Sequence, residues 1–243
     1  MIGLPDVYRL FFTPGEVAEI RAMGLSGKNK AWEGFARDVV AGYFDQPQAF
    51  GEAAQALDRA GAKAVYFTLN PCKPALLARA SNRLRAAGGK HCPLTADHDI
   101  VAIRWLPVDV DPRRPAEISS SRDELQTAMA TGRKVFDWMM EQGFARPLVA
   151  CSGNGCHLCF RLPDLPNTDE TQAMIKAALA VLKAQFEDQR VIIDQKVGNP
   201  ARIWKLYGTT TRKGDATGDR PHRRACIILE PEKAGADMPA GAS

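Results

Sequence analysis

The chain has 243 residues, of which 45% are hydrophobic and 25% are charged, and this composition is typical of a folded globular protein. No run of about 20 apolar residues predicts a membrane span, and residues 1–6 lack the pattern of a signal peptide. We therefore expect a cytoplasmic protein with no membrane partner, and because its six cysteines are few and show no framework spacing, we expect reduced thiols rather than disulfides. Its 32 Lys and Arg residues exceed its 28 Asp and Glu residues only slightly.

The first element expected along the chain is a helix that begins at Thr13 and ends at Gly24. Thr13 with Glu16 has the pattern of a capping box, Pro14 suits a first turn, and Gly24 is a typical stop. The pattern then predicts an extended segment at 32–44, a helix at 46–61, a strand at 64–69, and a helix that begins at Pro74 and carries Arg79, Arg83 and Arg85.

The second half of the chain predicts a mixture of strands and helices. In order, these are a strand at 100–111, a helix at 121–143, a hairpin of strands at 148–152 and 156–162, a helix at 168–188, and strands at 191–194, 202–207 and 225–229. The hairpin argues against a purely parallel sheet, and no linker interrupts the chain before residue 230. We therefore expect an α/β fold of the α+β kind in a single module, residues 1–233. Residues 234–243, rich in Ala and Gly, are expected to be a flexible tail or linker.

The positive charge is concentrated in two stretches. Residues 196–224 hold eight Lys or Arg against two Asp, and residues 73–104 hold six against two Asp. Such cationic stretches fit a polyanionic partner, although charge alone favours two solvated basic faces.

Carboxylates stand at the ends of two predicted strands. Asp109 and Asp111 end the first, and because residues i and i+2 of a strand share a face, both project together. Paired carboxylates suit Mg²⁺ or Mn²⁺, but an Asp-x-Asp is weak evidence alone, and Asp97 with Asp99 repeats it without the strand. Asp194 ends another apolar strand, where it could equally cap the next turn.

Between these acids lies a glycine-rich hairpin, residues 152–157, that contains Ser152, Gly153, Asn154, Gly155 and His157. Its two glycines allow a close approach to a ligand, and Ser152 and His157 offer donors to a phosphate. A structural imidazole at His157 is the alternative interpretation.

Taken in this order, the three motifs resemble those of the archaeo-eukaryotic primase superfamily, in particular its bacterial and phage primase-polymerase domains. The resemblance covers most of residues 64–229 and includes residues 66–71, the basic strand at 202–207, Lys213-Gly214 and Arg220 to Arg223. It implies an RRM-like catalytic core at 101–233 packed against an N-terminal α/β subdomain at 1–100.

The resemblance also implies template-directed nucleotidyl transfer by a DNA primase or polymerase that uses two metal ions, Mg²⁺ or Mn²⁺. Asp109, Asp111 and Asp194 would be the catalytic metal ligands. The incoming nucleoside triphosphate would be bound by the hairpin residues Ser152, Gly153, Asn154, Gly155 and His157 together with Arg202 and Lys205. Single-stranded DNA, the expected template, would be bound by Arg79, Arg83, Lys213 and Arg220, and the tail leaves room for a helicase or accessory domain in a longer parent protein.

Three alternatives compete with this interpretation. A glycosyltransferase that binds Mn²⁺ through Asp-x-Asp would not explain the hairpin, and a catalytically inactive RRM-like module that binds single strands would not need three acids. A rolling-circle nickase would need two histidines separated by one residue, which the sequence lacks. Zinc is not expected, because the spacing of Cys72, His91, Cys92 and His98 matches no familiar finger. Ribo- or deoxynucleotide preference and de novo priming stay open.

Overall fold

The computed structural model describes residues 2–87 and 93–232. The predictions for His91, Cys92 and the tail at 234–243 lie outside these residues. The described α-helices are α1 (Leu4–Phe11), α2 (Pro47–Arg59), α3 (Arg122–Glu141) and α4 (Asp169–Phe186), and the described 3₁₀ helices are η1 (Pro74–Arg79), η2 (Asp97–Asp99) and η3 (Gln195–Gly198).

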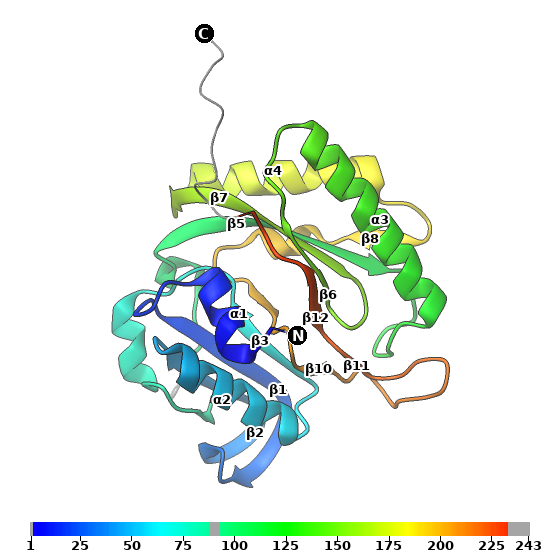
Figure 1. The fold of residues 1–243 in the computed structure, drawn as a ribbon. Coiled ribbons are helices and arrows are strands. Elements are labelled where there is room, and N and C mark those ends of the chain that lie inside the picture. Colours follow the sequence, from blue (N-terminus) through cyan, green and yellow to red (C-terminus); the bar gives the residue numbers. More distant parts are fainter. Residues whose placement is uncertain (1, 88–92, 233–243) are drawn as a thin grey trace.

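The strands form two larger sheets and one short ladder (Figure 1). Their bounds are β1 (Ala18–Asn29), β2 (Trp32–Phe44), β3 (Ala64–Thr68), β4 (Arg85–Ala86), β5 (Ala102–Pro112), β6 (Leu148–Cys151), β7 (Cys156–Pro166), β8 (Val191–Ile193), β9 (Ile203–Lys205), β10 (Thr210–Thr211), β11 (Arg223–Arg224) and β12 (Cys226–Leu229). Nearly all pairs are antiparallel, with β2–β4 a short parallel exception. This mixed architecture confirms the expected α+β class.

The first sheet has the order β4-β2-β1-β3-β9 and carries α1 and α2 on one face. Ala18, Ile20 and Ala22 of β1 alternate into the core that these helices cover, because every second residue of a strand points to the same side. The opposite face of the same strands carries Glu19, Arg21 and Met23.

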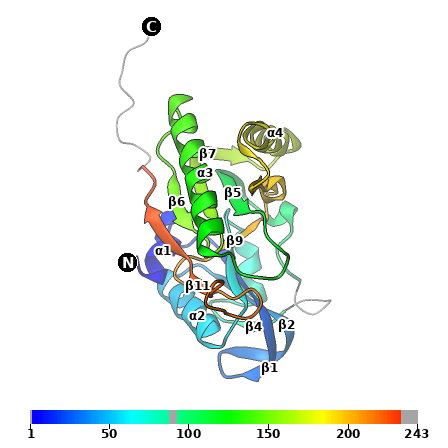
Figure 2. The same ribbon diagram turned by 90° about the vertical axis from the view of Figure 1, so that its right-hand side faces the viewer.

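The second sheet has the order β12-β6-β7-β5-β8, and α3 and α4 pack on it (Figures 1 and 2). Helix α3 begins with the predicted capping box. Ser121 Oγ accepts a hydrogen bond from the backbone of Glu124, and the Glu124 carboxylate accepts one from the backbone of Ser121.

Two features join the sheets. Strand β9 lies late in the sequence, yet it pairs with β3 in the first sheet, with Tyr66 opposite Lys205. The Phe11 ring of α1 lies 4.9 Å from that of Phe67 in the first sheet and 5.0 Å from that of Trp105 in the second. One hydrophobic core therefore runs through both halves of the chain.

The helix predicted from Thr13 to Gly24 is wrong. The Thr13 backbone donates to Glu16 Oε2 at 2.8 Å, as in a capping box, but Gly15 at φ +94° closes a turn instead. The following residues form β1, which pairs with β2 on one side and β3 on the other. Two strand partners override a local helix signal that has no apolar stripe to bury.

The helix predicted to carry Arg79, Arg83 and Arg85 is also wrong beyond its first turns. The 3₁₀ helix ends at Arg79, and Asn82 adopts φ +47°, which interrupts a right-handed helix. The chain then pairs with β2 as β4, so Arg79 and Arg83 share no helical face.

None of the described helices is both long enough and apolar enough to cross a membrane. The cysteines among the described residues, Cys72, Cys151, Cys156, Cys159 and Cys226, form no disulfide with one another.

Candidate functional site

A cavity of about 230 Å³ opens where the two sheets meet. Its walls come from β1 and β3 of the first sheet, from β5 and the β6–β7 hairpin of the second, and from the segments around β9 and β10. The lining residues are Met23, Tyr66, Asp109, Asp111, Ser152, Asn154, His157, Asp194, Val197, Arg202, Ile203, Trp204, Lys205, Thr211 and Lys213. The fold thus gathers all three predicted acids, the hairpin and three of the predicted cations around one space.

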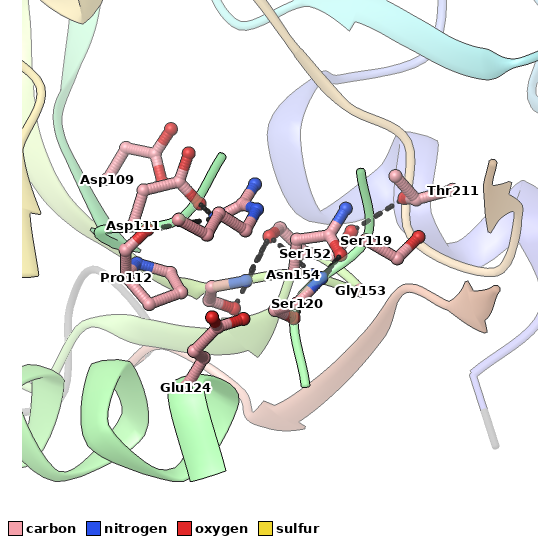
Figure 3. A network of polar contacts seen from close by, with 12 residues as sticks. Asp109, Asp111, Pro112, Ser119, Ser120, Glu124, Ser152, Gly153, Asn154 and Thr211 are labelled. Atoms are coloured by element: carbon pink, nitrogen blue, oxygen red, sulfur yellow. Dashed lines mark hydrogen bonds and ion pairs between the residues drawn. The ribbon is translucent and has the colours of Figure 1, made fainter. Parts of the chain in front are cut away.

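Asp109 and Asp111 lie near the end of β5, and Figure 3 shows their carboxylates side by side. Asp109 is opposite His157 of β7, while Asp111 is opposite Ile192 of β8. Asp109 Oδ1 is buried and accepts no hydrogen bond within the described residues. Arg114 Nη1 lies 3.5 Å from Asp111 Oδ1. A buried acceptor that makes no hydrogen bond of standard geometry, next to a second carboxylate, fits a divalent cation.

The two carboxylates have opposite pKa shifts. Burial raises the pKa of Asp109, but the nearby charges of His157, Lys213 and Arg202 outweigh it and hold the pKa below its ordinary value. Burial and the negative charge of Asp109 raise the pKa of Asp111. The paired acids therefore repel each other, and cationic neighbours or a bound cation relieve that repulsion.

His157 is the cross-strand neighbour of Asp109, and its Nε2 lies 3.4 Å from Asp109 Oδ1. Its Nδ1 lies 3.1 Å from the Tyr207 hydroxyl, which also accepts a 2.7 Å hydrogen bond from Trp204 Nε1. The imidazole and the Trp204 ring are stacked, with centroids 4.0 Å apart. Both ring nitrogens thus have protein neighbours, so this geometry favours His157 as a residue that positions Asp109.

The hairpin is held by its own side chains. Ser152 Oγ accepts hydrogen bonds from the backbone N–H of Gly155 at 2.9 Å and of Asn154 at 3.3 Å, so these donors are already used. Asn154 Oδ1 accepts from the Ser120 backbone, whereas its Nδ2 is buried without a partner among the described residues (Figure 3). The free donor that the hairpin offers to a ligand is therefore the Asn154 amide.

Glycine is required at position 155. A Cβ there would lie 2.7 Å from Asp111 Oδ1 and closer still to the Val110 carbonyl oxygen. The hairpin can therefore approach the paired acids only because residue 155 has no side chain. Gly153 has φ +97° and packs against Thr211 and the Arg223 carbonyl.

Asp194 lines the cavity but is turned toward its own chain. Its Oδ1 accepts a 2.8 Å hydrogen bond from the Lys196 backbone and so caps η3, which is the alternative role that the sequence left open. Its backbone N–H donates to the Asp109 carbonyl at 3.1 Å, which places it beside the pair. Among the residues that the structure describes, no three His, Cys, Asp or Glu side chains form a cluster that could hold a metal.

Three of the predicted cations line the cavity, and they differ in the contacts that their side chains already make within the protein. Arg202 Nη2 is 3.9 Å from Asp194 Oδ2, and its Nε is buried without a hydrogen-bond partner in the described chain. The Lys213 charge lowers the pKa of Asp109. Lys205 Nζ donates to Thr209 Oγ1 at 2.8 Å and to the Thr210 carbonyl at 3.0 Å, so this ammonium is engaged within its own loop.

The other predicted nucleic-acid contacts lie outside the cavity and are tied into the fold. Arg79 donates to the Tyr43 hydroxyl and lies 3.6 Å from Asp99. Arg83 pairs with Glu33 at 3.0 Å. Arg220 forms a two-pronged ion pair with Glu124, at 2.6 and 2.8 Å, which supports the capping box of α3.

Some residues in the cavity wall or directly behind it could not be selected from the sequence. Arg114, behind Asp111, is one of many arginines. Tyr66 stands in a segment of the family resemblance that has no assigned role, yet it lines the cavity, and burial together with the two acids raises its pKa. Trp204 and Tyr207 have only a strand pattern in the sequence, and the tertiary fold alone places them against His157.

Two of the four zinc candidates, Cys72 and His98, lie within the described residues, and they differ in burial. Cys72 is buried and its thiol contacts the Thr68 and Thr95 hydroxyls, while the His98 side chain is 80% exposed. His91 and Cys92 lie outside the described residues.

Two solved structures are similar to this chain. Primase RepB′ aligns over 93% of this chain and 55% of its own, at 13% identity and a TM-score of 0.43. The polymerase domain of Mycobacterium tuberculosis Ligase D, in complex with DNA, aligns over 90% of this chain and 79% of its own, at 14% identity and a TM-score of 0.46. The chain thus spans about half the length of the first. No family model and no curated protein sequence matches it.

Proposed function

We propose that this chain is a template-directed nucleotidyltransferase, a DNA primase or polymerase that joins nucleotides on single-stranded DNA. The observation that carries the proposal is the pair of carboxylates of Asp109 and Asp111, in a cavity that also holds Arg202, Lys213 and the side-chain amide of Asn154. The buried Oδ1 of Asp109 accepts no hydrogen bond of standard geometry within the described residues and has His157 Nε2 3.4 Å away. Paired hard oxygen donors facing cations and a free amide suit a metal-bound triphosphate. The nucleoside triphosphate and the template are its proposed partners.

Asp109 and Asp111 would hold the divalent cations, with Asp194 as a third ligand once its carboxylate turns from the Lys196 backbone. Bound Mg²⁺ or Mn²⁺ would lower the pKa of the attacking 3′-hydroxyl and stabilise the charge of the leaving pyrophosphate. Arg202 and Lys213 would neutralise phosphate oxygens, and Asn154 Nδ2 would donate to one of them. Ser152 and Gly155 shape the hairpin that brings this amide to the acids, and His157 positions Asp109.

Primer extension on a single-stranded template tests the proposal. With labelled nucleotides and Mg²⁺ or Mn²⁺, we expect incorporation by the wild-type chain and a loss of more than about 100-fold in Asp109→Asn and Asp111→Asn, since altering even an outer-shell partner of a metal costs about 10–100-fold. Asp215→Asn, an exposed loop acid, is the matched control and should retain wild-type incorporation. Reactions without a primer distinguish priming from extension.

Undiminished extension by both active-site variants would refute the assignment of the acids. A wild-type chain that binds the template but incorporates no nucleotide with either metal would instead be the non-catalytic binding module.

A further inference from the structure

Strands β1 and β2 extend from the body of the molecule as a long hairpin, at the bottom of the view in Figure 1. Near its end Phe35 is 61% exposed, the largest exposed fraction among the large hydrophobic side chains of the described residues. A lone aromatic ring in water is unremarkable, so its surroundings decide whether it has a role.

Phe35 shares a face of the hairpin with Arg37. Ala36 and Val40 of the same strand are fully buried in the core beneath α2, so the odd-numbered residues between and beside them point to the opposite side. Arg37 stands directly opposite Ser26 of β1. We call the exposed residues of this side, Ser26, Lys28, Phe35 and Arg37, the hairpin face.

Cations without acidic partners lie along the hairpin and at its base. Within the described residues, Lys28, Lys30, Arg37 and Lys63 are exposed and form no ion pair. The two acidic residues of β2 form no ion pair with these cations. Glu33 pairs with Arg83, and Asp38 accepts a hydrogen bond from the Gly24 backbone. The Lys63 side chain lies directly over Gly24, at the base of the hairpin face. The surface is therefore positively charged around one exposed aromatic ring.

The hairpin face continues the wall of the cavity. Arg21 of β1 is opposite Tyr66 on one side and Ala41 on the other, so these residues share the side that carries Arg37. Met23 and Tyr66 line the cavity itself. Between Ala22 and Leu25 the pairing of β1 with β2 shifts register, and both of these residues are buried in the core, so the even-numbered Lys28 lies on the same side as Met23. The two are five residues apart along β1, or at most roughly 16 Å at the rise of a strand.

We propose that the hairpin face binds single-stranded DNA, with a base stacked on Phe35 and the backbone phosphates on Lys28, Arg37 and Lys63, and that it leads this strand toward the cavity. The identification of the strand as the template rests on the proposed function. Aromatic rings between unpaired cations are the combination that binds single strands without sequence preference, whereas a protein partner would favour a wider apolar patch. In this proposal the hairpin face takes the DNA-binding role that the family resemblance implied for Arg79, Arg83 and Arg220. Each of those three side chains forms an ion pair within the protein.

Fluorescence anisotropy with labelled oligothymidylate, without nucleotide or metal, tests this proposal independently of catalysis. We expect Phe35→Ala to weaken binding about tenfold, as for the removal of one stacked base, and Phe35→Trp to restore it. Replacing Lys28 and Arg37 by Ala should reduce the slope of log affinity against log salt by about 0.7 for each phosphate that the variant no longer neutralises. Met174→Ala and Lys176→Ala on α4, also exposed, are the matched controls and should bind as the wild type.

Unchanged affinity and salt slope in the hairpin variants, with wild-type thermal melts, would overturn the proposal even if the chain extends primers. Loss of self-association in Phe35→Ala without a change in oligothymidylate binding would overturn it too, because the face would then serve a second copy of the chain. Conversely, weakened binding in these variants together with a wild-type chain that incorporates no nucleotide would uphold the surface and refute the proposed enzyme.

Discussion

Lys205 illustrates how a residue's surroundings change the role suggested by its type. The sequence predicts that its ammonium neutralises a triphosphate. In the fold the side chain is 4% exposed, and burial lowers the pKa of Lys205 to about 7 despite the attraction of Asp58. At neutral pH this group therefore lies near its titration midpoint, and it is a weaker counter-charge for phosphate than Arg202 or Lys213.

Lys205 also makes the stability of the protein depend on pH. Because its folded pKa lies below its value of 10.5 in an unfolded chain, the unfolded state binds more protons between about pH 7 and pH 10. Stability from this group therefore rises with pH across that window and is constant below it, where the group is charged in both states. Against Lys205→Met, the wild type should gain roughly 1 kcal/mol of unfolding free energy per pH unit.

Urea unfolding of both proteins at about pH 6, 7.5 and 9 measures this gain, because groups common to both cancel in the difference. A difference that is the same at all three pH values would show that Lys205 keeps an ordinary pKa in the fold.

At the scale of elements, the β6–β7 hairpin depends on a glycine more than on its polar residues. Gly155→Ala places a methyl group against Asp111 and the Val110 carbonyl, both part of β5, so the hairpin must move away from the acids. We expect this variant to lose at least about tenfold in nucleotide incorporation and to unfold at a lower temperature.

Gly218→Ala is the control for this substitution, because a Cβ there meets no atom within 4 Å and the φ angle is not positive. It should change neither quantity. Equal behaviour of the two variants would mean that the hairpin does not need its close approach to β5.

An element could be predicted from the sequence where local chemistry determines it, and not where distant segments stabilise it. Helix α3, with its full capping box, and the hairpin at 152–157, with its turn glycines, follow from local chemistry, and so do the paired carboxylates. The strand at 18–29 could not be predicted, since its stability comes from β2 and β3 on either side. The bound state of Arg220 likewise depends on Glu124, 96 residues away in the sequence.

At the scale of the whole molecule, residues 1–100 and 101–233 form, we propose, one cooperative unit. The ladder between β3 and β9 and the aromatic contacts of Phe11 cross the boundary between them. Calorimetry should therefore show one unfolding transition whose calorimetric and van't Hoff enthalpies agree. Two separate transitions, or a fragment of residues 1–100 that folds alone, would contradict this expectation.

Strand β9 also limits how a substrate can enter. It is hydrogen-bonded into the first sheet through β3, while its Trp204 ring lies on His157 of the second sheet. A swing of one half against the other, the usual way of closing a lid over a ligand, would have to break that ladder or that stack. Gating must then come from side chains that line the cavity, such as Tyr66 and Arg202, rather than from a domain closure on the scale of microseconds to milliseconds. Entry and exit would be fast, and turnover would be governed by the bond-making step or by the movement of the DNA strand.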